Sequence, residues 1–161
     1  SKYKRKIILI KNNENLGLPS SINKAIEFSK GRYIMRLDSD DYLSRVFVQI
    51  HTLFLEMNRD LDAVSSDYVL VNDNENIIKR KFSKNNFIAC GIVFRREVLF
   101  DLGLYNPDFK YREGHELMKK FNKNKFKMGY SNFPLYKYRK HDKNRSDDLI
   151  IQEFDKKLKN E

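Results

Sequence analysis

The segment YIMRLDSDDYL, residues 33–43, runs from an apolar stretch typical of a β-strand into three closely spaced acids, Asp38, Asp40 and Asp41. The chain as a whole carries a formal net charge of +10, so this acidic cluster stands against a basic background. Like charges at this spacing repel one another. The cluster therefore indicates a solvated turn, a helix N-terminus or a bound divalent cation.

Strand-like and helix-like patterns alternate on both sides of the acids. The apolar run 6–10 favours a buried strand, and residues 20–31 have helical spacing of their apolar positions. Residues 32–37 favour a second strand, and residues 44–57 favour an amphipathic helix. This alternation is typical of an α/β fold with parallel strands.

The second half of the chain is less regular. We expect strands at 62–71 and 76–82, a strand and short helix within 87–103, a helix at 114–124 and closing strands within 127–141. No internal repeat or low-complexity linker interrupts the chain. The sequence thus predicts one α/β domain over residues 1–161, with a mixed, mainly parallel sheet flanked by helices.

Composition narrows the setting. The chain has 161 residues, of which 40% are hydrophobic, which is enough for one sizeable core. Its single cysteine, Cys90, cannot form an internal disulfide, and no apolar run approaches the ~20 residues of a membrane span. We expect a cytoplasmic protein whose contact with membranes, if any, is at the surface. The basic charge attracts polyanions such as nucleic acid, anionic lipid or the diphosphate of an activated sugar.

The acidic cluster follows a strand, and ligands of open α/β sheets bind outside the carboxyl ends of strands. In extended backbone Asp38 and Asp40 point to the same side, and carboxylates suit Mg²⁺ and Mn²⁺. An alternative is that Asp40 or Asp41 only caps the helix that begins near Ser44. A calcium loop of the EF-hand type does not fit, because three of its required positions hold other residues.

Three segments together resemble family 2 glycosyltransferases, which have the GT-A fold. Residues 13–43 resemble the family's loop, helix and strand that end in an Asp-x-Asp-Asp motif. Residues 90–121 resemble its later strand, turn and acceptor-side helix, and residues 134–146 resemble its closing Tyr-x-Arg-x-His segment. The likeness covers residues 7–146, and the order and spacing of the three segments make it specific.

The resemblance implies an inverting transfer of a sugar from a nucleotide sugar, in the first place a UDP-sugar, to a hydroxyl of a glycan or lipid-linked acceptor. It implies that Asp40 binds a cation, Mn²⁺ or Mg²⁺, and that Asp38 contacts the nucleotide ribose or the metal. His141 matches a family position near the metal, and Arg139 a position near the donor phosphates. A cation there would stabilise the charge of the leaving diphosphate.

Two positions depart from the family pattern. The family commonly has Glu-Asp before the acceptor-side helix, one of these acids being the general base, and here the pair is Glu113-Gly114. We expect Glu113 to be the base, with His115 as the alternative. Of the frequent Arg-Asn pair in the first helix only Asn23 is kept, and we expect it to contact the donor.

The resemblance also predicts that the nucleoside-holding elements of the family, roughly two βα units, are missing before residue 7. From this we expect a truncated GT-A domain that self-associates through its uncovered sheet edge and has no activity alone.

The rival hypothesis is a basic module that binds nucleic acid or an anionic surface without catalysis. It rests on the net charge and on tyrosines among lysines at 136–141. It explains the basic patches but not the placement of the acids, and the chain has no RNA-binding motif. Nucleic acid is therefore not the expected partner.

Overall fold

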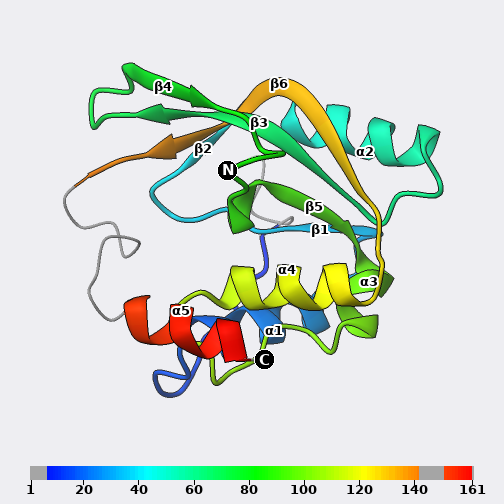
Figure 1. Ribbon diagram of the computed structural model, residues 1–161, viewed down its shortest axis with the longest axis vertical. Helices are drawn as coiled ribbons and strands as arrows, with labels where there is room; N and C mark the ends of the chain where they lie inside the picture. Colours follow the sequence, from blue (N-terminus) through cyan, green and yellow to red (C-terminus); the bar gives the residue numbers. More distant parts are fainter. Residues whose placement is uncertain (1–6, 142–150, 161) are drawn as a thin grey trace.

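The computed structural model describes residues 7–141 and 151–160, so the stretch 142–146 of the closing segment lies outside the described residues. Helices and strands follow one another in the chain as labelled in Figure 1: α1 (Leu18–Phe28), β1 (Tyr33–Met35), β2 (Tyr42–Leu43), α2 (Phe47–Met57), β3 (Ala63–Val71), β4 (Ile77–Lys81), the 3₁₀ turn η2 (Ala89–Gly91), β5 (Ile92–Arg95), α3 (Arg96–Asp101), α4 (Glu113–Lys123), β6 (Met128–Arg139) and α5 (Ile151–Asn160).

The strands form one mixed, curled sheet in the order β1-β5-β3-β6-β2. β5 pairs with the first part of β3, residues 63–65, and β4 pairs with its later part, residues 68–71. The expected α/β architecture is confirmed. The expectation of a mainly parallel sheet is wrong for the described pairings, because β3 and β6 run parallel and the other pairs are antiparallel. A short hairpin joins β3 to β4, and β5 returns between β1 and β3, which forces the antiparallel directions.

The strand expected at 6–10 is also absent where the chain is described. Residues 7–10 have no regular structure, and Ile7, Ile8 and Leu9 are exposed. A strand needs a hydrogen-bonded neighbour, and no described segment pairs with this run. The apolar pattern was therefore not enough to predict a strand here.

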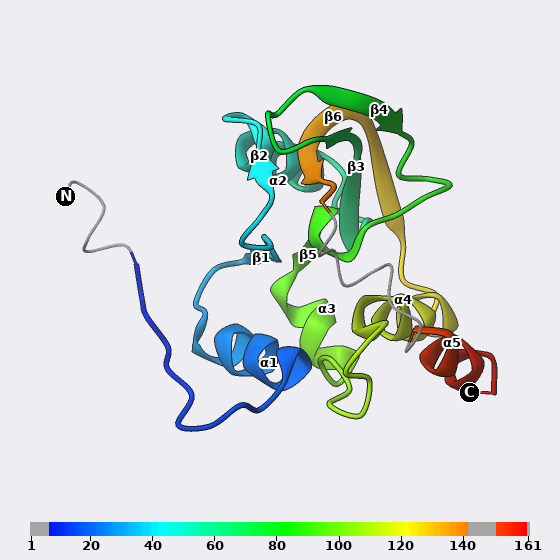
Figure 2. The same cartoon turned by 90° about the vertical axis from the view of Figure 1, so that its left-hand side faces the viewer.

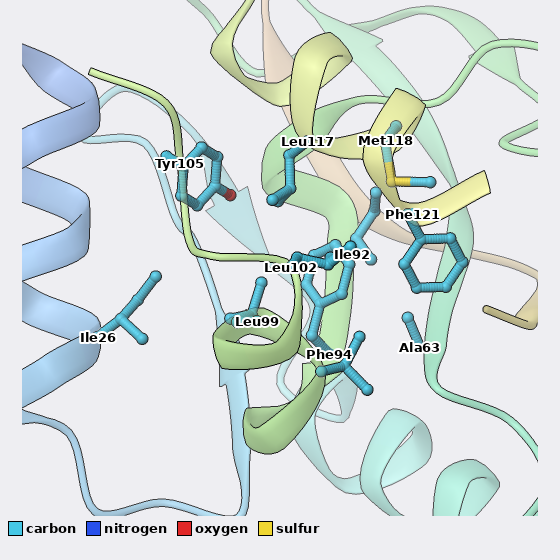
Figure 3. Packing of buried hydrophobic residues seen from close by; sticks show 11 residues of the cluster. Ile26, Ala63, Ile92, Phe94, Leu99, Leu102, Tyr105, Leu117, Met118 and Phe121 are labelled. Atoms are coloured by element: carbon cyan, nitrogen blue, oxygen red, sulfur yellow. The ribbon is translucent and has the colours of Figure 1, made fainter. Parts of the chain in front are cut away.

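Helices cover the sheet unequally. Figure 2 shows α1, α3, α4 and α5 gathered on one side, and α2 beside β2 and β6 at the other end. In α4 the buried Leu117 and Phe121 are four residues apart, and they pack on Phe94 of β5 and Leu99 of α3 (Figure 3). A second core lies under α2, where Phe47 and Leu55 meet strand residues such as Tyr136. No helix of the described part has the length and apolar character that crossing a membrane requires.

His51 lies fully inside this second core. Its Nδ1 donates to the backbone oxygen of Phe47 at 2.7 Å, and its ring packs on the Phe47 ring with centroids 4.1 Å apart. Its Nε2 is buried and has no partner among the described residues. Burial lowers the pKa of His51 because the charged ring would lose its hydration.

This burial predicts a pH-dependent stability. Below about pH 6.5 the unfolded chain takes up a proton on His51 that the folded chain resists, so the free energy of unfolding falls as the pH falls. Replacing His51 by Leu should flatten this dependence in urea unfolding between pH 7 and 5. The control Gln49→Leu, on the exposed side of α2, should keep the wild-type slope. An unchanged slope in H51L would assign the effect to another group.

Candidate active site

A cleft of about 1020 Å³ lies where the β1–β2 segment, the start of α4 and the end of β6 come together. These three regions belong to the three segments that were compared with the glycosyltransferase family. Most of the sequence-predicted site residues line this cleft: Asp38, Asp40, Glu113, His115 and His141. The fold therefore collects acids that are far apart in the chain.

Arg36 links the two sides of the cleft. Its guanidinium makes a two-pronged contact with Asp38, with Nε 2.8 Å from Oδ1 and Nη2 3.0 Å from Oδ2. Its Nη1 donates to Oε1 of Glu113 at 2.7 Å. Burial opposes the charge of Arg36, but the neighbouring carboxylates outweigh it and raise its pKa. Sequence reasoning missed this residue, although its position two residues before Asp38 places both on the same side of extended backbone.

Asp41 joins the acidic segment to β6. Its buried carboxylate accepts the hydroxyl of Tyr136 at 2.6 Å and the backbone N–H of Arg139 at 2.9 Å. Burial raises the pKa of Asp41, and these two hydrogen bonds act in the opposite direction. The alternative that an acid of the cluster caps the next helix is wrong, because α2 begins at Phe47 and has no side-chain cap.

Asp40 and His141 meet across the cleft, with Nε2 of the histidine 2.9 Å from Oδ2 of the aspartate. A second group of possible ligand atoms comes from Asp38, Asp41 and Cys90, and these atoms lie within 4.8 Å of one another. Burial raises the pKa of Cys90 to about 12, so its sulfur is a protonated thiol at neutral pH. Because hard cations prefer charged oxygen ligands, the carboxylates fit Mg²⁺ or Mn²⁺ better than the thiol does.

Glu113 stands at the first position of α4 and is largely buried. The preceding residue, Arg112, adopts a left-handed backbone conformation with φ 60°, which turns the chain into the helix. Two residues further on, the ring of His115 packs on Phe87 with centroids 4.9 Å apart. Partial burial and the nearby Arg112 lower the pKa of His115, which favours a neutral ring.

The structure does not bring two of the expected donor-binding residues into the cleft. The side-chain amide of Asn23 donates to the backbone oxygen of Tyr105 at 2.7 Å and accepts its N–H at 2.9 Å. This pair ties α1 to the loop before α4. Arg139 does not line the cleft either; its guanidinium lies over the ring of Tyr42 and donates to the Tyr42 hydroxyl.

The loop before α4 is held from outside by α5. Asp155 accepts two hydrogen bonds from Arg112, at 2.9 and 3.3 Å. The ring of Phe154 packs on Phe109 and Tyr111, with centroid distances of 6.2 and 5.5 Å. These contacts fix the chain immediately before Glu113.

Comparison with known proteins decides the family. Residues 1–120 match the family model described as Glycosyl transferase family 2. The chain belongs to this family. It is 39% identical over 75 residues to an uncharacterized glycosyltransferase of Methanocaldococcus jannaschii, covering 47% of this chain and 26% of that protein. It is 34% identical over 115 residues to the UDP-Glc:alpha-D-GlcNAc-diphosphoundecaprenol beta-1,3-glucosyltransferase WfaP of Escherichia coli, covering 66% and 44%.

Solved structures agree on the fold of this family 2 glycosyltransferase chain. The S. aureus TarS 1-349 complex with UDP-GlcNAc superposes with a TM-score of 0.72 and 17% identity, over 92% of this chain and 47% of TarS 1-349. The GT-A architecture is thereby confirmed. The chain spans less than half the length of each of these relatives.

The two contacts of Arg36 predict a large effect of its removal. Replacing Arg36 by Met leaves Asp38 and Glu113 without the positive charge of the guanidinium. The free energy of unfolding should fall by about 2 kcal/mol, which is less than the loss expected when a fully buried ion pair is broken. Adding Glu113→Gln should restore part of the loss. The control Arg32→Met breaks an exposed pair with Glu56 and should change little. Strictly additive losses in chemical denaturation of the single and double variants would contradict the coupling.

Proposed function

We propose that this chain is the catalytic part of a metal-dependent, inverting glycosyltransferase that takes its sugar from a UDP-sugar. Membership of the family supports sugar transfer, and the names of two relatives support the donor. The E. coli relative is named for UDP-Glc, and TarS has been crystallised with UDP-GlcNAc and with UDP. The observation that carries the proposal is that Asp38, Asp40 and Glu113 line one cleft, in which Arg36 bridges Asp38 and Glu113.

Asp40 and Asp38 would hold the divalent cation, Mn²⁺ or Mg²⁺, with His141 beside them. The cation, when bound, supplies positive charge to the diphosphate that leaves the donor. Within the described residues the Asp40 carboxylate has His141 as its hydrogen-bond partner, and a histidine can also serve as a metal ligand. Asp38 is held by Arg36, which fixes its position and leaves it less free to move toward an ion.

Glu113 would act as the general base. Its Oε atoms would accept the proton of the acceptor hydroxyl as that oxygen attacks the anomeric carbon of the donor. The bond from this carbon to the diphosphate oxygen breaks at the same time, and the diphosphate leaves with the electron pair. Arg36 orients the carboxylate, and the turn at Arg112 places it at the start of α4. His115, two residues further along α4, is the second choice because its ring packs on Phe87.

The remaining expected residues are assigned indirect roles. Asn23 would position the loop before α4 through Tyr105, and Arg139 would position Asp41 through its backbone N–H. The acceptor is proposed to be a glycan or a lipid-linked sugar at the cytoplasmic face of a membrane. The E. coli relative, whose name gives a diphosphoundecaprenol-linked acceptor, supports this class.

Asp40 is tested by cation binding. Replacing Asp40 by Asn removes one charged ligand, so the affinity for Mn²⁺ in the presence of UDP should fall about tenfold or more, with folding unchanged. Isothermal titration calorimetry measures this directly. Asp60→Asn, which changes an exposed acid outside the cleft, is the matched control. Equal Mn²⁺ affinity in D40N and wild type would remove Asp40 from the metal site.

Glu113 is tested by steady-state kinetics. Loss of a general base typically lowers turnover by about 10²–10⁴-fold, so Glu113→Gln should lower kcat in that range while the affinity for the donor stays near wild type. Glu97→Gln, an exposed acid at the start of α3, is the control. A variant that keeps most of its turnover would move the base to another residue, His115 first.

A further inference from the structure

The β3–β4 hairpin forms an edge of the molecule that the proposed chemistry does not use. Figure 2 shows β4 running along the outside of the sheet, at the end opposite α1, α4 and α5. Among the described strands β4 pairs only with β3, so its outer edge is open. One residue of β4, Lys81, lines the cleft, while the other four residues of the strand are exposed.

Large apolar side chains are exposed on β4, directly after it, and on β6, which pairs with the other side of β3. The exposed fractions are 67% for Ile77, 56% for Ile78, 56% for Phe82 and 61% for Phe133. Arg80 links the Phe82 and Phe133 regions, because it donates to the backbone oxygen of Asn132 and its guanidinium lies 5.3 Å from the centroid of the Phe82 ring. We call these four apolar residues the hairpin patch.

Positive charge accompanies the hairpin patch. Residues 77–84 contain four basic residues and no acid. Lys79 and Lys84 are exposed and form no ion pair within the described part of the chain. Arg80, in contrast, is neutralised by the buried Asp67 at 2.7 Å. The free positive charges therefore lie at the surface beside exposed apolar groups.

Two features argue against a second copy of this chain as the occupant. The β3–β4 ladder has a bulge between Leu70 and Val71 that leaves Ile78 without a partner, and bulges disfavour pairing of sheet edges. Two copies paired through β4 would also bring lysines of like charge together. A partner that takes up apolar side chains and attracts lysines fits the hairpin patch better than a second copy does. A bilayer with anionic headgroups has both properties.

We propose that the hairpin patch docks this chain on a membrane that contains anionic phospholipid. The apolar side chains enter the boundary between headgroups and acyl chains, and Lys79 and Lys84 contact lipid phosphates. The acids of the hairpin tip, Asp73 and Glu75, lie outside the patch, and Glu75 faces Lys137 at 4.0 Å. Because Lys81 also lines the cleft, the docked hairpin contributes one residue to the wall of the cleft.

Vesicle sedimentation tests the docking without any sugar transfer, so its result is independent of the proposed function. The chain should bind vesicles that contain phosphatidylglycerol more tightly than vesicles of phosphatidylcholine alone, and added salt should weaken this binding. Ile78→Ser together with Phe82→Ser should abolish most of it. Lys79→Ala and Lys84→Ala should each weaken it about fivefold, as expected for one basic residue near an anionic surface.

Exposed apolar residues elsewhere supply the matched control. Val48 and Leu53 of α2 are 56% and 57% exposed, so Val48→Ser with Leu53→Ser changes comparable apolar area away from β4. This control should bind vesicles like the wild type, and thermal unfolding should show that all variants fold. Equal loss in the α2 and β4 variants would overturn the proposal. So would a lack of preference for phosphatidylglycerol, or a dimer in light scattering that the β4 substitutions abolish.

Discussion

The guanidinium of Arg36 between Asp38 and Glu113 is the interaction on which the cleft depends. The two carboxylates come from positions 75 residues apart in the chain, and Arg36 itself is separated from Glu113 by 77 residues. The Arg36 side chain thus joins the end of β1 to the start of α4. This explains how a basic chain holds several acids in one place without strong repulsion.

The other acids of the cluster have separate partners. Asp41 is fixed by a hydroxyl and a backbone N–H of β6, and Asp40 meets His141 beyond the end of that strand. The end of β6 is therefore tied to this short acidic segment at two places. The family model matches residues 1–120, and β6 begins only at Met128, so residues outside that match also help to form the cleft.

Local patterns in the sequence predicted part of this arrangement. Apolar periodicity gave the helices at α1, α2 and α4, and the acids at the end of β1 indicated the ligand-binding edge. The directions of the strands and the irregular run at 7–10 were missed, since periodicity reports which residues are apolar and not which strand lies beside them. The roles of Arg36, Asn23 and Arg139 depend on partners far away in the chain, and no local pattern encodes those contacts. The family resemblance accounts for the acids, which a basic nucleic-acid module does not explain.

The central claim is that the end of β1, the start of α4 and the end of β6 form one cation and nucleotide site. Paramagnetic broadening of backbone NMR signals by Mn²⁺ in the presence of UDP measures this most directly. The account predicts that broadening is strongest at residues 36–41, 112–115 and 138–141 and is reduced by Asp40→Asn. Broadening centred instead on the exposed acids Asp73 and Glu75, or unchanged in D40N, would contradict it.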